Sequence, residues 1–329
     1  MQAIISHRRD FDGIASAAEL VLYLESLDEH AQTILFTNPG REEWSSTLDK
    51  LKDVKNSNIY IADLSLPKGC EDLILQFEHI KSQGNRIIWI DHHAWPEEIA
   101  KKIENIADML VWGDNKSKCA AELIYEKLCE GNSTCKSIAM LAHFTDFNVK
   151  SEDEGLDNNL TKISQCIAYL DSDDKRSNEL REKLLEQVVT GSIIGGVIDQ
   201  IYSEYKRSEE ENLKKLKETL RILDAGGIRI SMAFAYNLQS NMACARMKEL
   251  SGSNIEIFVT TKDWSAHVRS DSGIDSLLLS REFGGNGHEQ ASGFTIKMGN
   301  KNIENAINEY ADKVFERAKS VYSKSQLKI

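Results

Sequence analysis

The sequence predicts an α/β protein, with a doubly wound parallel sheet first, then a helical connector and a second, smaller α/β domain. Three short runs of mostly branched apolar residues, 3–6, 59–62 and 86–90, are typical of strands buried on both faces of a parallel sheet. Helix-like segments alternate with these runs, and they start near Ile14, Glu42, Lys68 and Pro96. This alternation of strand and helix is the pattern of doubly wound folds.

Composition divides the chain into three parts. We expect a sheet domain over residues 1–150, a helical connector over 151–225 and a smaller α/β domain over 226–329. The connector is rich in Lys and Glu, with leucines at helical spacing up to Leu223. In the last part, strand-like runs and a final amphipathic helix are expected at 228–235, 255–260, 294–296 and 302–323. A chain of 329 residues is long enough to bury two separate cores.

The net charge and the cysteines limit which substrates the protein can bind and in which cellular compartment it is expected. A formal net charge of −12 argues against a surface that neutralises the phosphates of a long nucleic acid, so short or small anionic substrates fit better. The six cysteines lack a Cys-x-x-Cys pair, and we expect reduced thiols rather than a zinc ribbon or a disulfide framework. No apolar run approaches the roughly 20 residues that span a bilayer, and no signal segment precedes the first strand. We therefore expect a cytoplasmic protein without membrane partners.

Acidic residues and histidines follow each of the three buried runs. Open α/β sheets bind their ligands at the carboxyl ends of the strands, which is where these residues fall. The three groups are His7-x-x-Asp10-x-Asp12, the single Asp63, and Asp91-His92-His93. Several carboxylates that meet in one crevice would repel each other unless a cation neutralised them. The sequence therefore predicts a metal site at this edge of the sheet.

These motifs resemble those of the DHH phosphoesterase family, which includes RecJ-type exonucleases, nanoRNases, cyclic-dinucleotide phosphodiesterases and family II pyrophosphatases. A second motif, Gly284-Gly285-Asn286-Gly287-His288 followed by residues 291–294, resembles the Gly-Gly-Gly-His signature of the DHHA1 domain that accompanies most members. The two motifs lie about 200 residues apart in the expected order. The resemblance thus implies a DHH catalytic domain, a connector and a DHHA1 substrate-binding domain.

The resemblance implies a centre for two metal ions with six protein ligands. These ligands are His7, Asp10, Asp12, Asp63, His92 and Asp146. His7 and Asp10 would hold one ion and Asp12, His92 and Asp146 the other, with Asp63 between them. Carboxylate and imidazole ligands suit Mn²⁺, with Mg²⁺ or Co²⁺ as alternatives. His143, near Asp146, is expected to pack beside the site without ligating.

Two features depart from the family pattern. His7 and Asp10 are separated by two residues, a different spacing from that of other members, so a shifted loop or a water in place of His7 are alternatives. The two intervening residues are Arg8 and Arg9, which are unusual neighbours for a metal site. Either one of them faces a substrate phosphate, or both are ordinary surface arginines.

His93 is expected to contact the scissile phosphate and to assist departure of the leaving alcohol as an acid. Asp91 is the second residue expected to take part in catalysis. No Ser or Cys nucleophile is required, because a hydroxide that bridges two metal ions has a lowered pKa and can attack phosphorus. Trp95 is the tryptophan best placed to stack a nucleobase, whereas Trp89 is expected in the core.

The glycine motif predicts a loop that binds the substrate's phosphate or its terminal nucleotide. Glycines permit positive φ and close backbone approach, so that amide groups can face an anion. Arg269-Ser270 resembles the Arg-Ser element that accompanies this loop in DHHA1 domains. Asn286 replaces a glycine of the usual signature. The expected substrate-binding residues are Arg269, Ser270, Gly284, Gly285, Asn286, Gly287 and His288.

The leading interpretation is a divalent-metal-dependent phosphodiesterase that hydrolyses short single-stranded RNA or DNA from one end, as RecJ-like exonucleases and nanoRNases do. Cyclic dinucleotides or 3′-phosphoadenosine 5′-phosphate are alternative substrates. A pyrophosphatase is disfavoured, because the partner domain of that group lacks the glycine loop. From another class, a non-catalytic nucleic-acid or replication-complex binder is disfavoured, because such relatives have lost metal ligands. The sequence leaves open DNA or RNA, the polarity of degradation and whether the chain forms a homodimer.

Overall fold

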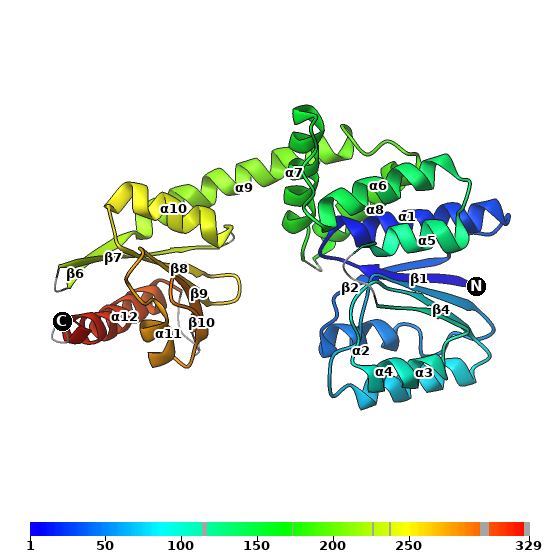
Figure 1. Cartoon of the computed structure of the whole chain (residues 1–329), viewed down its shortest axis with the longest axis horizontal. Helices are drawn as coiled ribbons and strands as arrows, with labels where there is room; N and C mark the ends of the chain where they lie inside the picture. The colour runs from blue at the N-terminus through cyan, green and yellow to red at the C-terminus, as the bar shows by residue number, and fades with distance from the viewer. Residues whose placement is uncertain (114–116, 173, 226, 237, 297–302, 326–329) are drawn as a thin grey trace. The chain divides into compact units, whose positions relative to one another are not determined.

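The computed structural model describes the chain except for residues 114–116, 173, 226, 237, 297–302 and 326–329 (Figure 1). Its contacts divide the chain into two compact units, Met1–Tyr205 and Lys206–Ile329. This division falls inside the stretch 151–225 that the sequence predicts as a connector. Gly226, where the second domain is expected to begin, lies outside the described residues. The three-part division of the sequence stays a prediction.

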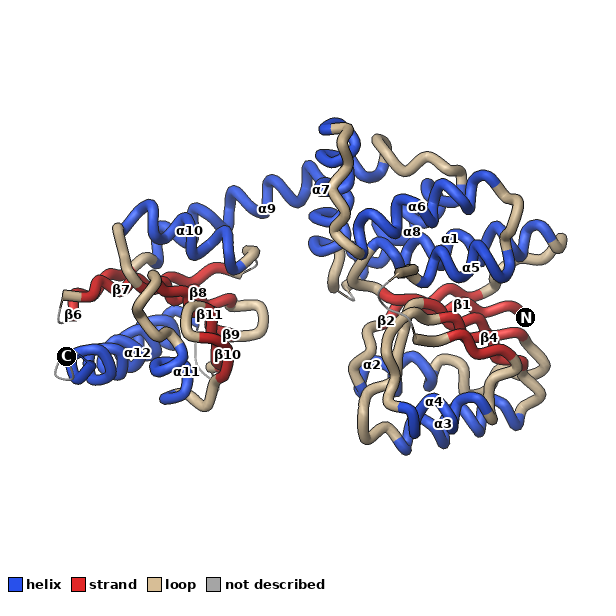
Figure 2. The backbone as a smooth tube through the Cα atoms, in the orientation of Figure 1, coloured by secondary structure: helices blue, strands red, loops and turns tan. Residues whose placement is uncertain are grey.

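Unit 1 contains the predicted parallel sheet, which has five strands in the order β2-β1-β3-β4-β5. Figure 2 shows strands of this sheet in red with helices above and below them. The strands are β1 (Gln2–His7), β2 (Thr33–Thr37), β3 (Asn58–Ala62), β4 (Arg86–Ile90) and β5 (Met109–Val111). Every pairing among them is parallel. The chain runs from β1 outward to β2 and then returns to the other side of β1 for β3. The order of the strands therefore reverses between β1 and β3, and the carboxyl ends of open sheets bind ligands at such a point.

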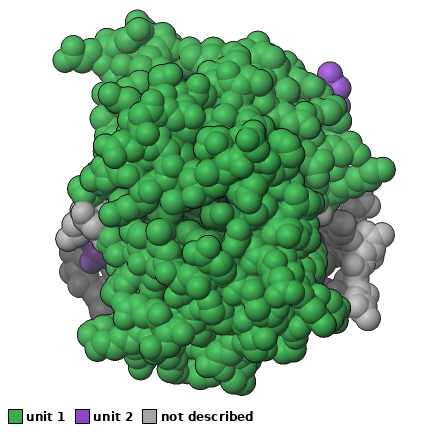
Figure 3. All heavy atoms as spheres, turned by 90° about the vertical axis from the view of Figure 1, so that its right-hand side faces the viewer, with its two compact units in different colours: residues 1–205 green, residues 206–329 purple. Residues whose placement is uncertain are grey.

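Helices cover both faces of this sheet, as the predicted doubly wound fold requires. One face packs against α1 (Phe11–Ser26) and α5 (Ala120–Leu128), and the same core also includes residues of α6 (Ser133–Asp146), α7 (Glu154–Tyr169) and α8 (Lys175–Val189), which contact α1. The other face packs against α2 (Arg41–Asp49), α3 (Glu71–Ser82) and α4 (Glu97–Glu104). Neighbouring residues of β1 illustrate the two-sided burial, because Ile4 belongs to the first core and Ile5 to the second. Figure 3 shows unit 1 as a closely packed body.

The helix starts differ from the predicted ones by one to three residues for identifiable reasons. Helix α1 begins at Phe11 instead of Ile14, because the side chain of Asp10 accepts a hydrogen bond from the amide of Gly13 and caps the helix. Helix α3 begins at Glu71 instead of Lys68, because Gly69 has a left-handed backbone (φ 70°) that a helix does not tolerate.

Unit 2 contains a six-stranded mixed sheet in the order β10-β11-β9-β8-β7-β6. The strands are β6 (Arg221–Ala225), β7 (Ile228–Ala235), β8 (Ile255–Thr260), β9 (Ser265–Ser270), β10 (Asn286–His288) and β11 (Ala291–Thr295). Helices α11 (Leu277–Glu282) and α12 (Ile303–Ser325) pack on one face, and α10 (Ser240–Ser251) packs on the other. This is the smaller α/β fold that the sequence predicts.

The prediction of helix up to Leu223 is wrong at its end. Helix α9 (Val197–Thr219) stops earlier, and residues 221–225 form the edge strand β6, which pairs antiparallel with β7. Leu223 is spaced like a helix residue, yet its burial pattern alternates with that of exposed Ile222, as in a strand that has one face on a core. Separately, no helix among the described residues is long and apolar enough to cross a membrane.

The buried acid Glu19 in the core of unit 1 makes the stability of the protein depend on pH. Glu19 on α1 is fully buried, and neither of its carboxylate oxygens has a hydrogen-bond partner among the described residues. Burial raises the pKa of Glu19 well above its usual value of 4.5, and the neighbouring Cys135 and Asp12 raise it further. Folding therefore takes up a proton at this residue above about pH 4.5, and stability falls as the pH rises toward the raised pKa.

We expect Glu19→Gln to stabilise the protein more at about pH 8 than at about pH 5, because the amide keeps the shape of the protonated acid and needs no proton. The gain in the free energy of unfolding should grow by up to ~1.4 kcal/mol per pH unit. Urea unfolding of both proteins at the two pH values measures it. The exposed Glu25 on the same helix gives the control Glu25→Gln. Equal pH responses of the two variants would contradict a neutral Glu19.

Candidate metal centre

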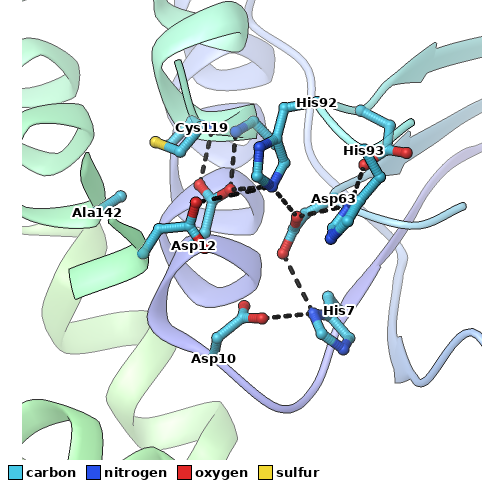
Figure 4. Close-up of polar contacts among 12 residues, drawn as sticks. His7, Asp10, Asp12, Asp63, His92, His93, Cys119 and Ala142 are labelled. Carbon is cyan, nitrogen blue, oxygen red and sulfur yellow. Dashed lines mark hydrogen bonds and ion pairs between the residues drawn. The ribbon is translucent and has the colours of Figure 1, made fainter. Parts of the chain in front are cut away.

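The structure brings the six predicted ligands together where the carboxyl ends of β1, β3 and β4 meet the helices of unit 1 (Figure 4). They form two groups, and within each group the candidate ligand atoms lie within 4.8 Å of one another. The groups are His7 with Asp10 and Asp63, and Asp12 with His92 and Asp146. A third group of the same kind contains Asp63, His92 and His93. The groups overlap at Asp63 and His92, which suits a centre for two ions.

In the first group, His7 lies between two carboxylates. Its Nδ1 is 2.7 Å from Asp10 Oδ2 and 3.3 Å from Asp63 Oδ2. Burial disfavours a charge on His7, but its hydrogen bonds to the two acids prevail and raise its pKa to about 10. For Asp10, burial is likewise outweighed by the hydrogen bond and charge of His7, which lower its pKa to about 2. A divalent cation binding here would displace the proton that His7 carries.

Asp63 has an unusual, left-handed backbone conformation that directs its carboxylate into the site. It follows β3 directly, with a left-handed φ of 55°, and its amide donates to the carbonyl of Ile90 at 3.0 Å. Aspartate is among the few residue types that tolerate this conformation. The turn directs Oδ2 toward His7, while Oδ1 lies 3.4 Å from His92 Nε2. Burial, followed by the charge of Asp10, raises the pKa of Asp63. Its carboxylate thus faces both groups of ligands.

In the second group, His92 faces two further carboxylates. Its Nε2 lies 3.8 Å from Asp12 Oδ2 and 3.8 Å from Asp146 Oδ2. Burial, followed by the charge of Asp63, raises the pKa of Asp12. The two oxygens of Asp12 also accept hydrogen bonds from the amides of Ala120 and Ala121, at 2.7 and 2.9 Å. Those amides begin α5, where the helix dipole favours a negative charge.

Unpaired atoms at the centre indicate that a cation fits there. Asp63 Oδ1 and both ring nitrogens of His92 are buried and have no hydrogen-bond partner among the described residues. Leaving such atoms unpaired is energetically costly, and native proteins usually avoid it. His92 Nε2 faces three carboxylates, so a divalent ion there would give His92 Nε2 and Asp63 Oδ1 a partner. Oxygen and imidazole ligands suit Mn²⁺ and related hard or borderline ions.

Asp91 does not join the ligand groups but holds His93. It is fully buried, and its Oδ1 accepts a hydrogen bond from His93 Nδ1 at 2.7 Å. Its Oδ2 accepts one from the indole Nε1 of Trp95. The bond to Asp91 outweighs burial and raises the pKa of His93. The side chain of His93 is 40% exposed, so its second nitrogen remains accessible from solvent.

Trp95, the tryptophan that the sequence made the better candidate for stacking a nucleobase, lies in the core instead. Its side chain is buried, packs edge-on against Trp89 at 4.9 Å and donates to Asp91. The sequence placed Trp95 near the site, but it gave no sign that the buried Asp91 takes this indole as a donor. His143 packs beside the centre, as expected. It bonds Glu122 Oε2 at 2.8 Å, its ring contacts Phe147, and it is not in a ligand group.

The predicted substrate-binding residues lie in unit 2, on one edge of its sheet. Asn286, Gly287 and His288 form β10, Gly284 and Gly285 precede it, and Arg269 and Ser270 end β9. Arg269 and His288 both pair with Ala291 of the strand between them, so that the two basic side chains lie on the same face.

Two of the glycines in this loop are required by their surroundings. An added Cβ at Gly285 would lie 2.1 Å from the carbonyl oxygen of Gly293. Gly287 has a φ of 140° and would place a Cβ 2.5 Å from Ser292 Cα. The backbone of the loop therefore lies directly against β11, and the binding of an anion by this loop stays a prediction. The guanidinium of Arg269 bonds the side-chain oxygen of Asn241, which the sequence did not indicate.

Comparisons with known proteins agree with this architecture. Residues 2–169 match the sequence model of the DHH family, N-terminal domain. No curated protein matches the chain. A crystal structure of exonuclease RecJ bound to manganese is similar with a TM-score of 0.50 and 14% identity, over 96% of this chain and 89% of that one.

Two other solved structures match at lower TM-scores. An exopolyphosphatase-related protein from Bacteroides fragilis gives 0.44 at 16% identity, over 98% of this chain and 92% of that one. A pGpG-specific phosphodiesterase from Vibrio cholerae gives 0.46 at 15% identity, over 97% of this chain and 99% of that one.

Asp63 is the ligand candidate whose loss should affect both metal positions. We expect Asp63→Asn to weaken Mn²⁺ binding by at least about 10- to 100-fold and to reduce the tightly bound ions from two per chain to at most one. Isothermal titration calorimetry of metal-free protein measures this. The control is Asp72→Asn, because Asp72 pairs with Arg41 on the surface of α3. Two tightly bound ions in Asp63→Asn would exclude a bridging role for Asp63.

Proposed function

The chain belongs to the DHH family, and on this basis we propose that this metal-dependent phosphoesterase hydrolyses short single-stranded oligonucleotides, removing nucleotides from one end. The observation that carries the proposal is the chain of three ligand groups, in which Asp63 joins the group of His7 and Asp10 to a group with His92, and His92 joins that group to Asp12 and Asp146. Two hard-ligand positions that share a carboxylate are the arrangement used to cleave phosphate esters.

The roles of the individual residues follow from their positions. His7, Asp10 and Asp63 would hold one divalent ion, and Asp12, His92 and Asp146 the other. When bound, such ions lower the pKa of water and neutralise the charge that develops on the phosphoryl group. The α5 amides keep Asp12 in place, and the left-handed turn at Asp63 keeps its carboxylate directed at both groups.

His93 is the candidate for proton transfer to the leaving group. Asp91 accepts a hydrogen bond from Nδ1–H of His93 and so fixes the orientation of the ring. Nε2 is then the ring nitrogen that can face the substrate. In the imidazolium form, Nε2–H donates its proton to the oxygen of the departing alcohol. The indole of Trp95 donates a hydrogen bond to the second oxygen of Asp91. The two hydrogen bonds together fix the orientation of the Asp91 carboxylate.

Unit 2 supports a substrate that carries a nucleotide. Arg269 and His288 share one sheet face beside a glycine loop whose backbone lies against β11, and such loops present amides to anions. The net charge of −12 favours short substrates over long nucleic acid. The likeness in fold to exonuclease RecJ bound to manganese is in line with cleavage at a nucleic-acid end.

Small nucleotides are the second candidate substrates, and the acidic charge of the chain favours them equally. They include cyclic dinucleotides and 3′-phosphoadenosine 5′-phosphate. A non-catalytic binding protein fits less well, because the full set of six ligand candidates is present and gathered at one place.

Turnover should depend on the metal centre and on His93. We expect the protein with Mn²⁺ to cleave end-labelled short RNA or single-stranded DNA, tested beside 3′-phosphoadenosine 5′-phosphate, cyclic dinucleotides and pyrophosphate. His93→Ala should lower kcat by about 10²- to 10⁴-fold with little change in KM, because it removes a proton donor used in the transition state. Asp12→Ala should abolish turnover, and Asp72→Asn serves as the control. Full turnover by Asp12→Ala would refute the proposed site.

The glycine loop should affect binding rather than chemistry. We expect His288→Ala to raise KM by about 10- to 100-fold, the effect of losing a hydrogen bond to a charged group. The Mn²⁺ content, measured by elemental analysis, should stay at the wild-type value. Loss of metal without a change in KM would instead place His288 among the ligands.

A further inference from the structure

The two arginines between His7 and Asp10 contact one carboxylate from a distant part of the chain. Arg9 Nε lies 2.9 Å from Asp171 Oδ2, and Arg8 Nε lies 3.7 Å from Asp171 Oδ1. Asp171 belongs to the turn between α7 and α8. The turn between α7 and α8 therefore reaches the loop between β1 and α1, which carries Asp10 and separates His7 from Asp12.

Asp171 is itself held in place by buried groups. Arg181 on α8 is 1% exposed, and its guanidinium donates to the carbonyls of Leu170 and Ser172, on either side of Asp171. The Asn38 side chain, just beyond β2, donates to Asp171 Oδ1 at 3.4 Å. A buried arginine that fixes the backbone on both sides of a carboxylate leaves that carboxylate little freedom. Asp171 is thus suited to orient the groups that bind it.

Arg8 and Arg9 differ in what they can still bind. The side chain of Arg8 is 11% exposed, and its amide extends the β1–β2 pairing by donating to the carbonyl of Thr37. The side chain of Arg9 is 64% exposed. Within the described parts of the chain, Asp171 is the partner of its guanidinium, through Nε. A guanidinium is a planar fork with five N–H donors, so one edge can bind a carboxylate while the other binds a phosphate.

We propose that Arg9 is a specificity-determining residue that binds a second phosphate group of the substrate, and that Asp171 is the residue that positions it. The inference rests on the proposed function, since it assumes a phosphate ester at the metal centre. Arg9 immediately precedes Asp10, so their Cα atoms are one step of about 3.8 Å apart. Because the Arg9 side chain starts beside a metal-ligand candidate and most of it is exposed, a phosphate next to the scissile one is the group that we expect it to bind. The preferred substrate is then a short nucleotide that carries a terminal phosphate beside the bond to be cleaved.

Two diadenylates that differ in one group test this directly: one with a 5′-terminal phosphate and one without. The measured quantity is the ratio of their KM values in Mn²⁺. We expect the wild type to prefer the phosphorylated form by about tenfold or more, as a charge-assisted hydrogen bond implies. Arg9→Ala should lose most of this preference. Arg9→Lys should retain part of it, because lysine keeps the charge but not the fork.

Substitutions of Asp171 test whether it positions Arg9. We expect Asp171→Asn to reduce the preference for the phosphorylated form by about threefold to tenfold, and Asp171→Glu, which keeps a carboxylate, to restore part of it. The control is Asp199→Asn on α9, which loses an ion pair with Lys162 in the same helical segment. This control should keep the wild-type ratio. A ratio that falls equally in the control would show a general effect of the helical segment and overturn the role of Asp171.

The role of Arg9 can be tested whether or not the proposed function is correct. If the wild type cleaves neither diadenylate, the proposed function fails, and the same ratio is measured as dissociation constants by calorimetry in Mn²⁺. A preference that is lost in Arg9→Ala supports the inference in either assay. An unchanged preference in Arg9→Ala overturns it. Equal weakening of both ligands together with loss of Mn²⁺ also overturns it, because Arg9 would then act on the metal ligands.

Discussion

The constraint on which this structure depends is the electrostatic cost of gathering four carboxylates and two imidazoles in one buried crevice. Without a cation, burial and then the neighbouring carboxylates raise the pKa of Asp12 and Asp63, while hydrogen bonds to Asp10 and Asp63 outweigh burial and raise the pKa of His7. His92 keeps unpaired ring nitrogens. A fold that sustains this arrangement stores free energy that divalent ions release on binding. The candidate metal centre is therefore a property of the assembled sheet and helices.

The rest of unit 1 serves to hold these groups against their repulsion. The parallel sheet brings three strand ends to the point where strand order reverses, and each end supplies a ligand candidate. The start of α5 supports Asp12 through two amides, and the pair of Asp91 and Trp95 fixes His93. The turn between α7 and α8 reaches the loop after β1 through Asp171. The start of α5 and the turn between α7 and α8 thus restrain parts of the site in addition to packing in the core.

The sequence could predict what is encoded locally. The buried strands β1, β3 and β4 were found because their apolar runs are short and branched, and Asp63 was found because it directly follows such a run. Contacts between distant segments could not be found in this way. The amides that hold Asp12 come from α5, and Asp171 comes from beyond α7. The contact of Trp95 with Asp91 is local, but the direction of a side chain is not encoded in the spacing of the residues. Edge strand β6 was missed because Leu223 continues a helical spacing of leucines until the antiparallel pairing with β7 overrides it.

We propose that two cations occupy the two candidate ligand groups that Asp63 connects through its approach to His92, and anomalous X-ray diffraction from crystals grown with Mn²⁺ tests this proposal. We expect two manganese peaks about 3.5–4 Å apart. One should lie among His7, Asp10 and Asp63 and the other among Asp12, His92 and Asp146, with the Asp63 carboxylate touching both. A single peak, or peaks away from these side chains, would contradict it.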